Sequence, residues 1–175
     1  MIISRHDDPA LQPWHENLSK RQVKAPKIYF RDSGLLHTLL DIQDMHTLMG
    51  NPRLGASTLL DIQDMHTLMG NPRLGASWEG FAMEQVLQLT RPAESYFWAT
   101  HSGAELDLFF IKNGKRIGVE FKFNEAPKIS KSMRVALHDL SLSHLWVVYP
   151  GRHSYPVAED ITVLPLENSS EIIKA

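Results

Sequence analysis

The sequence predicts an α/β fold in which a mixed central β-sheet is flanked by helices. Helix-like segments come first, a pair of strand-like segments follows, and a further helix and strand complete an order typical of such a domain. Asn113-Gly114 separates the paired segments and is the strongest short signal for a β-hairpin. The chain has 175 residues, 43% of them hydrophobic and 22% charged. These values favour one globular domain over residues 1–175.

Each expected element has a local signal. Residues 1–27 are polar and irregular, and 28–30 form a short apolar segment. Asp32 or Ser33 is a suitable N-cap for a helix through residue 40. Ser77 is a suitable N-cap for a helix over residues 78–89, whose core face would consist of Trp78, Phe81, Ala82, Val86 and Leu89. Strands are expected at 96–99, 106–112, 115–123, 145–149 and 161–164, and a helix at 130–140.

The chain contains an internal repeat. Residues 38–57 and 58–77 both read TLLDIQDMHTLMGNPRLGAS. Full identity indicates a recent or engineered tandem duplication, since a solenoid needs at least three repeats. Gly-Asn-Pro is expected to break the helix within each copy. We expect one copy to fill the native position and the other to be looped out or to pack against a neighbour.

Composition excludes several classes of protein. The chain has no cysteine, which rules out disulfides, thiolate metal sites and cysteine nucleophiles. It has neither an apolar run of membrane-spanning length nor a secretory signal, so we expect no membrane partner and a cytoplasmic location.

Charge is distributed unevenly along the chain. The net charge is −2, but two regions are locally basic and are candidates for binding nucleic-acid phosphates. The alternative is an ordinary solvated surface. The candidate nucleic-acid-binding residues are Lys20, Arg21, Lys24, Lys27, Lys128 and Lys131.

The hairpin brings acidic residues together. A two-residue turn at Asn113-Gly114 sets Asp107 opposite Glu120, and Glu105 opposite Lys122, on one face of the ribbon. The other face would be wholly apolar and would face the core. Facing carboxylates lie about 4.5–5.5 Å apart at Cβ and repel each other, so they need a cation or a shared proton.

A divalent cation fits such a pair. Mg²⁺ takes oxygen ligands, and a nearby lysine can orient a water or stabilise charge that develops on a phosphate. Asp107 and Glu120 are therefore candidate ligands for Mg²⁺, or for Mn²⁺, and Lys122 is a candidate catalytic residue. The alternative is an exposed polar face with two cross-strand salt bridges.

The spacing of Asp107, then Glu120-Phe121-Lys122, resembles the PD-(D/E)XK nuclease superfamily, although Leu106 replaces the proline. The resemblance implies a restriction endonuclease-like fold. It also implies a further acid from a preceding helix, for which Glu84 is the candidate and Glu79 the alternative.

A longer resemblance covers most of the chain. The segments PWHENLSKRQVKAPKIYFRDSGLLHTLL, GASWEGFAMEQVL, YFWATHSGAELDLFF and GVEFKF look like the uncharacterised C-terminal domain of prokaryotic AAA-type ATPases. That family implies an N-terminal P-loop module, and the chain contains no P-loop motif.

Three functional hypotheses follow from the two resemblances. The first is a Mg²⁺-dependent nuclease-like domain that acts on DNA and is detached from its ATPase. The second is a non-catalytic module that binds DNA, an ATPase module or another protein. The third is a truncated fragment with no independent role.

Overall fold

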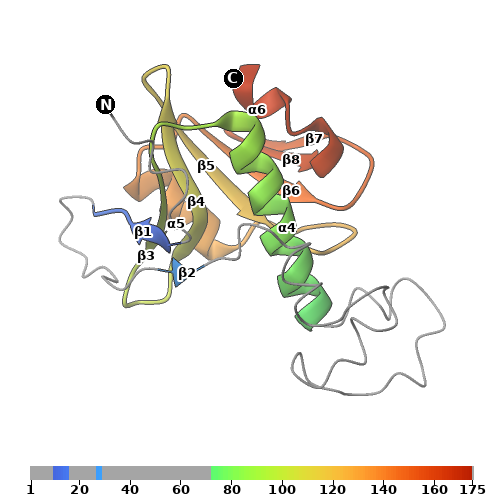
Figure 1. The fold of residues 1–175 in the computed structure, drawn as a ribbon, viewed down its shortest axis with the longest axis horizontal. Coiled ribbons are helices and arrows are strands. Elements are labelled where there is room, and N and C mark those ends of the chain that lie inside the picture. The colour runs from blue at the N-terminus through green and yellow to red at the C-terminus, as the bar shows by residue number, and fades with distance from the viewer. Residues whose placement is uncertain (1–9, 16–26, 29–71, 175) are drawn as a thin grey trace.

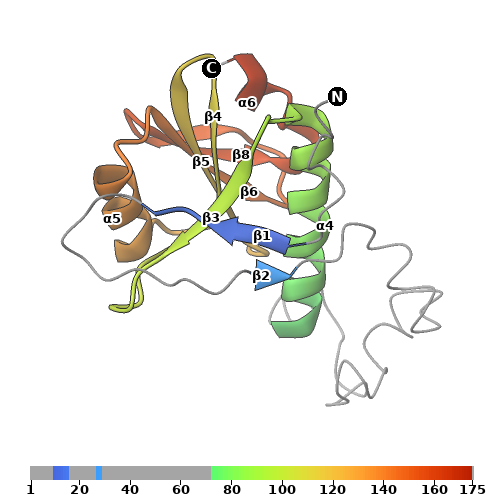
Figure 2. The same cartoon turned by 60° about the vertical axis from the view of Figure 1, so that its left-hand side comes forward.

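A mixed β-sheet with helices on both faces forms the protein. The computed structural model describes residues 10–15, 27–28 and 72–174. Its eight strands follow the order β2-β1-β3-β4-β5-β6-β8-β7. Helix α4 (Pro72–Thr90) covers one face of the sheet and α5 (Lys131–Asp139) the other (Figures 1 and 2). The predicted α/β class with a mixed, helix-flanked sheet is confirmed.

The sheet contains both parallel and antiparallel strand pairs. The strands are β1 (Ala10–Pro13), β2 (Lys27–Ile28), β3 (Ser95–Ala99), β4 (Glu105–Lys112), β5 (Lys115–Phe121), β6 (His144–Tyr149), β7 (Tyr155–Ala158) and β8 (Ile161–Pro165). Pairs β1–β3, β5–β6 and β6–β8 are parallel, and the other pairs are antiparallel. Helix η2 (Leu166–Asn168) and helix α6 (Glu171–Lys174) follow β8.

The predicted hairpin forms with the predicted turn. Asn113 and Gly114 have φ angles of 52° and 75°, and two positive values are what a type I′ turn requires. Lys112 lies opposite Lys115, and Leu108 lies opposite Val119. The register expected from the two-residue turn is therefore confirmed over this part of the ribbon.

The hairpin face that was expected to be apolar does face the core, except at Leu106, but the face that was expected to be polar is also partly buried. Leu108 and Val119 belong to the core cluster beneath α4. Phe109, on the opposite side, is also fully buried, in a second cluster with Met133 and Ala136 of α5. The sheet is covered on both faces because β5 continues into parallel pairing with β6, and helices cover both faces of such a sheet.

A bulge in β4 changes which side chains share a face. Tyr96 pairs with Phe109 and Trp98 with Leu106, so one residue of β3 lies opposite two residues of β4, Asp107 and Leu108. The strand therefore carries one extra residue, and its alternation reverses. Accordingly, Leu106 lies in the α5 cluster and Leu108 in the α4 cluster. The reversal falls at Asp107.

Helix α4 differs from its expected form. It begins at Pro72 rather than after Ser77, because proline is well suited to the first helical position. Residues 72–77 are the part of the repeat that the structure describes. Phe81 and Leu89 were expected to face the core, but they are 39% and 43% exposed, and Met83 is buried instead.

The remaining differences concern short elements. Strand β1 lies within the segment expected to be irregular, and β7 and α6 were not expected. Ser130 caps α5 by accepting a hydrogen bond from the Met133 amide at 3.1 Å, at the start of the helix that was expected at 130–140. The helix expected through residue 40 lies outside the described residues. Among the helices described, none has the length and apolarity needed to cross a membrane.

Candidate functional site

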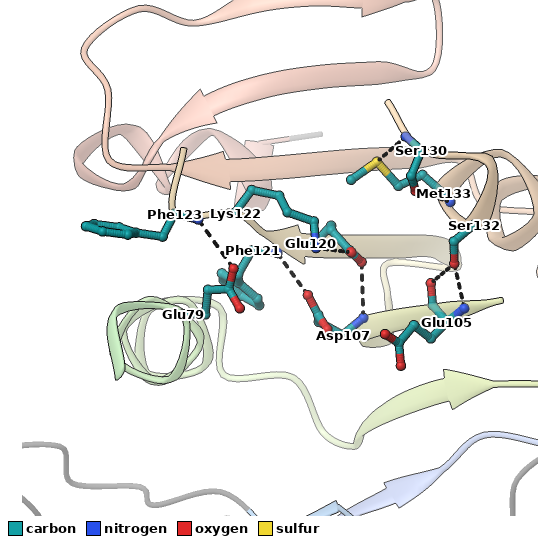
Figure 3. Close-up of polar contacts among 10 residues, drawn as sticks. All are labelled: Glu79, Glu105, Asp107, Glu120, Phe121, Lys122, Phe123, Ser130, Ser132 and Met133. Atoms are coloured by element: carbon teal, nitrogen blue, oxygen red, sulfur yellow. Dashed lines mark hydrogen bonds and ion pairs between the residues drawn. The ribbon is translucent and has the colours of Figure 1, made fainter. Parts of the chain in front are cut away.

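Two carboxylates lie where the backbone pairing of β4 and β5 ends. The last regular pair in the register is Leu108 with Val119. Beyond it, the Phe121 amide donates to Oδ2 of Asp107 at 3.1 Å, and the Asp107 amide donates to Oε2 of Glu120 at 3.4 Å (Figure 3). Each acid therefore accepts a hydrogen bond from the opposite strand, in place of a backbone carbonyl.

Lys122 completes this cluster from the end of β5. Its Nζ atom lies 2.8 Å from Oε1 of Glu120 (Figure 3). Its amide donates to the carbonyl of Val148 at 2.9 Å, which keeps this part of the chain beside β6. The lysine side chain is 39% exposed, so a bound ligand can reach it, while that of Glu120 is 5% exposed.

The second predicted cross-strand pair, Glu105 with Lys122, is replaced by other contacts. Lys122 forms its ion pair with Glu120. The main chain of Glu105 is tied to α5, where the Ser132 hydroxyl accepts from its amide at 2.6 Å and donates to its carbonyl at 2.7 Å. The bulge accounts for the difference, because pairing beyond Leu108 no longer follows the register set by the turn.

Burial and the neighbouring charge of Asp107 make the ionised form of Glu120 unfavourable. Burial first, and then the charge of Asp107, raise its pKa to about 7 against the opposing effect of Lys122. Burial lowers the pKa of Lys122, but the combined interactions with Glu120, Asp107 and Glu79 outweigh this and the net change is upward. Lys122 is therefore a cation at neutral pH, and Glu120 is poised between its neutral and charged forms.

Glu79 is the helix acid that reaches the cluster. Its Oε1 atom accepts a hydrogen bond from the Phe123 amide at 3.3 Å (Figure 3). Burial raises its pKa, Lys122 lowers it, and Asp107 raises it, so all three charges lie within mutual influence.

Glu84, the first candidate for that role, lies elsewhere on α4. It accepts a hydrogen bond at 3.1 Å from the side chain of Gln88, one turn along the same helix. Five residues separate it from Glu79, which corresponds to a rotation of about 140° around the helix. Glu79 precedes the buried residues Ala82 and Met83 by three and four positions. That spacing was the sequence signal that favoured Glu79.

The predicted basic residues are only partly described. Lys128 and Lys131 are exposed, the first before α5 and the second at its start. Lys27 belongs to β2, and its side chain is outside the description. Lys20, Arg21 and Lys24 lie outside the described residues, so their role stays a prediction.

The donor set suits a hard cation, although it is small. Carboxylate oxygens are the ligands that Mg²⁺ prefers, often one or two with waters. Burial and the charge of Asp107 raise the pKa of Glu120 despite the nearby Lys122, so a further cation would stabilise its charged form. In the described part of the chain, no three acidic, histidine or cysteine side chains are grouped so that they could hold a metal ion. Any such ion would therefore depend on Asp107, Glu120 and water.

Comparison with known proteins identifies the family. Residues 74–168 match a domain of unknown function, DUF4143. The chain belongs to the DUF4143 family. Residues 9–46 match a second domain of unknown function, DUF8612.

Two mycobacterial proteins are similar to this DUF4143 chain over most of its length. Uncharacterized proteins of Mycobacterium bovis and of Mycobacterium tuberculosis are each 44% identical to it over 157 residues, or 90% of the chain. The chain spans 31% of the length of these curated relatives. DUF4143 occurs at the C-terminus of AAA-ATPase-like proteins, in agreement with the resemblance seen in the sequence. The nuclease-like resemblance stays a prediction.

Proposed function

We propose that this DUF4143 chain is a Mg²⁺-dependent nuclease-like domain that hydrolyses phosphodiesters in DNA. The observation that supports the proposal most is the buried Glu120 carboxylate beside Asp107 and the partly exposed Lys122. Acids and a lysine at the end of two strands, with a further acid from a helix, also fit the restriction endonuclease-like fold proposed for this sheet.

Each residue has a distinct task in this proposal. Asp107 and Glu120 would hold Mg²⁺, which when bound supplies a Lewis acid and a water of lowered pKa. The cationic Lys122 stabilises negative charge that develops on the phosphate, because its raised pKa makes it a poor base. Glu79 fixes the chain after Lys122 through the Phe123 amide and adds negative charge on the α4 side. Lys128 and Lys131 bind phosphates along the strand.

Cleavage of plasmid DNA tests the proposal. We expect nicking with Mg²⁺ or Mn²⁺ that is lost in Asp107→Ala and Lys122→Ala. Matched controls are Glu125→Ala and Lys115→Ala, which remove exposed charges near the site and in the turn. The proposal fails if the wild type does not cleave, or if all four variants cleave equally.

The two helix acids offer a second matched pair. Glu79→Gln should reduce cleavage more than Glu84→Gln, because only Glu79 is linked to the cluster by the contacts described above. A greater loss in Glu84→Gln would favour the original assignment of Glu84.

One observation favours a non-catalytic DNA-binding module as a second candidate. Lys122 and the two strand amides already compensate the acids without an ion. DNA binding that weakens steeply with salt, without cleavage under any divalent ion, would support the module.

A further inference from the structure

An open groove lies between α4 and the segments that follow β6 and β8. It has a volume of about 480 Å³. Trp78, Phe81, Gln85 and Leu89 line one side, and Leu166 and Glu167 lie among the residues on the other. The α4 residues recur every three or four positions, so they form one continuous stripe on the helix.

The stripe is unusual because it presents large apolar side chains to solvent. Phe81 is 39% exposed and Leu89 is 43% exposed. The structure contains comparable exposure at Ile111 and Val157, 45% each, but these residues do not line the groove. An exposed aromatic ring in a concave surface gains free energy when a flat, apolar partner covers it.

The groove adjoins the candidate site through the contact between Trp78 and Phe123. Its Trp78 ring lies 5.6 Å from the ring of Phe123, centroid to centroid. The amide of Phe123 binds Glu79, and Phe123 directly follows Lys122. Lys122, Pro150 and Leu166 each follow the carboxyl end of one of the parallel strands β5, β6 and β8. Ligands of open α/β sheets bind at this edge.

Charge separates the groove from the phosphate site. Among the groove residues that the structure describes, the charged side chain is that of Glu167. A carboxylate repels phosphate, but it can accept a hydrogen bond from the amino group of cytosine. The side-chain oxygen of Gln85 can likewise accept a hydrogen bond from the amino group of adenine. The cations Lys122, Lys128 and Lys131 lie outside the groove lining.

We propose that this groove binds an unstacked nucleobase of a single DNA strand whose phosphate lies at Lys122. The inference rests on the proposed function and names its substrate, which is a single-stranded or locally opened strand. Phe81 and Trp78 stack on the base. Glu167 favours bases with an exocyclic amino group, so cytosine is preferred over thymine.

Fluorescence anisotropy with labelled single strands tests this. Binding is measured at low salt in EDTA, so that cleavage does not interfere. Phe81→Ala should weaken binding of oligodeoxycytidine roughly 5- to 150-fold, the range expected for one base stacked on an aromatic ring. Ile111→Ala is the control and should stay within about twofold. Glu167→Gln should reduce the preference for oligodeoxycytidine over oligothymidine.

Three results overturn the inference. They are absence of oligonucleotide binding by the wild type, equal binding by Phe81→Ala, and self-association in light scattering that Phe81→Ala abolishes, which would assign the groove to a second copy of the chain. Plasmid cleavage by the wild type is read separately. If the wild type cleaves plasmid DNA but Phe81→Ala binds oligonucleotides as tightly as the wild type, only the proposed base-binding groove is refuted. If Phe81→Ala weakens binding but the wild type does not cleave, only the proposed nuclease activity is refuted.

Discussion

The ionisation of Glu120 should make the stability of the protein fall as pH rises. Its side chain is 5% exposed, and burial first, then Asp107, raises its pKa from 4.5 to about 7. The difference corresponds to about 3 kcal/mol. Because the folded state holds the proton more tightly than the unfolded state, this stability is present below pH 4.5 and lost between about pH 4.5 and 7.

Glu120→Gln isolates this effect. Glutamine keeps an oxygen that can accept the Asp107 amide and removes the charge. Near pH 5 the free energies of unfolding of the variant and the wild type should differ less, because the Glu120 side chain is mostly neutral in the folded state there. At pH 8 the variant should be more stable by up to about 3 kcal/mol, which corresponds to roughly 6–12 °C in melting temperature for a chain of this size.

Urea unfolding of both proteins at pH 5 and pH 8 measures the effect. His144 contributes with the opposite sign, because burial lowers its pKa and its neutral form is favoured as pH rises. Both proteins contain His144, so the difference between them removes its contribution. If the free energy of unfolding depends on pH equally in the two proteins, the proposed strain at Glu120 does not exist.

Three further predictions concern the metal, a loop and the repeat. At pH 8, Mg²⁺ should raise the melting temperature of the wild type more than that of Asp107→Ala, since a bound ion relieves carboxylate repulsion; equal shifts would remove Asp107 from the ligand set. Gly151→Ala should cost about 2–3 kcal/mol in urea unfolding, because its Cβ would lie 2.1 Å from the Tyr149 ring, whose hydroxyl binds the His153 carbonyl. Gly80→Ala, where the new Cβ meets nothing within 4 Å, is the control and should not destabilise. Deletion of residues 58–77 should leave a folded chain with an unchanged type of circular dichroism spectrum; an aggregated product would show that both copies are integral.

The sequence predicted those features that depend on neighbouring residues. The Asn113-Gly114 turn determines the register of β4 and β5 as far as Leu108 and Val119, because a two-residue turn leaves one alternative for each facing pair. The helix expected at 130–140, which the structure shows as α5, is equally local. Pro72 was also a local signal, since proline suits the first position of a helix, but the start of α4 was expected only after Ser77.

Features that depend on distant partners were not predicted. The extra residue in β4 arises from its pairing with β3 across the sheet, and no pattern within residues 105–112 indicates it. Strand β1 is four residues long and gains its pairing from β3, more than 80 positions later. Burial of Phe109 depends on α5, which covers a face that the hairpin alone would expose.

The bulge explains why the acids of the candidate site both complete the hydrogen bonding of the strands and have unusual electrostatics. Regular pairing would have satisfied the strand amides with backbone carbonyls. With one extra residue in β4, the Asp107 carboxylate accepts a hydrogen bond from the Phe121 amide, and the Glu120 carboxylate accepts one from the Asp107 amide. Glu120 is buried in the position where it makes this contact. Burial raises the pKa of Glu120, and so creates the demand for positive charge that Lys122 partly meets. The same hydrogen bonds that end the hairpin therefore produce the electrostatic imbalance on which the proposed metal site depends.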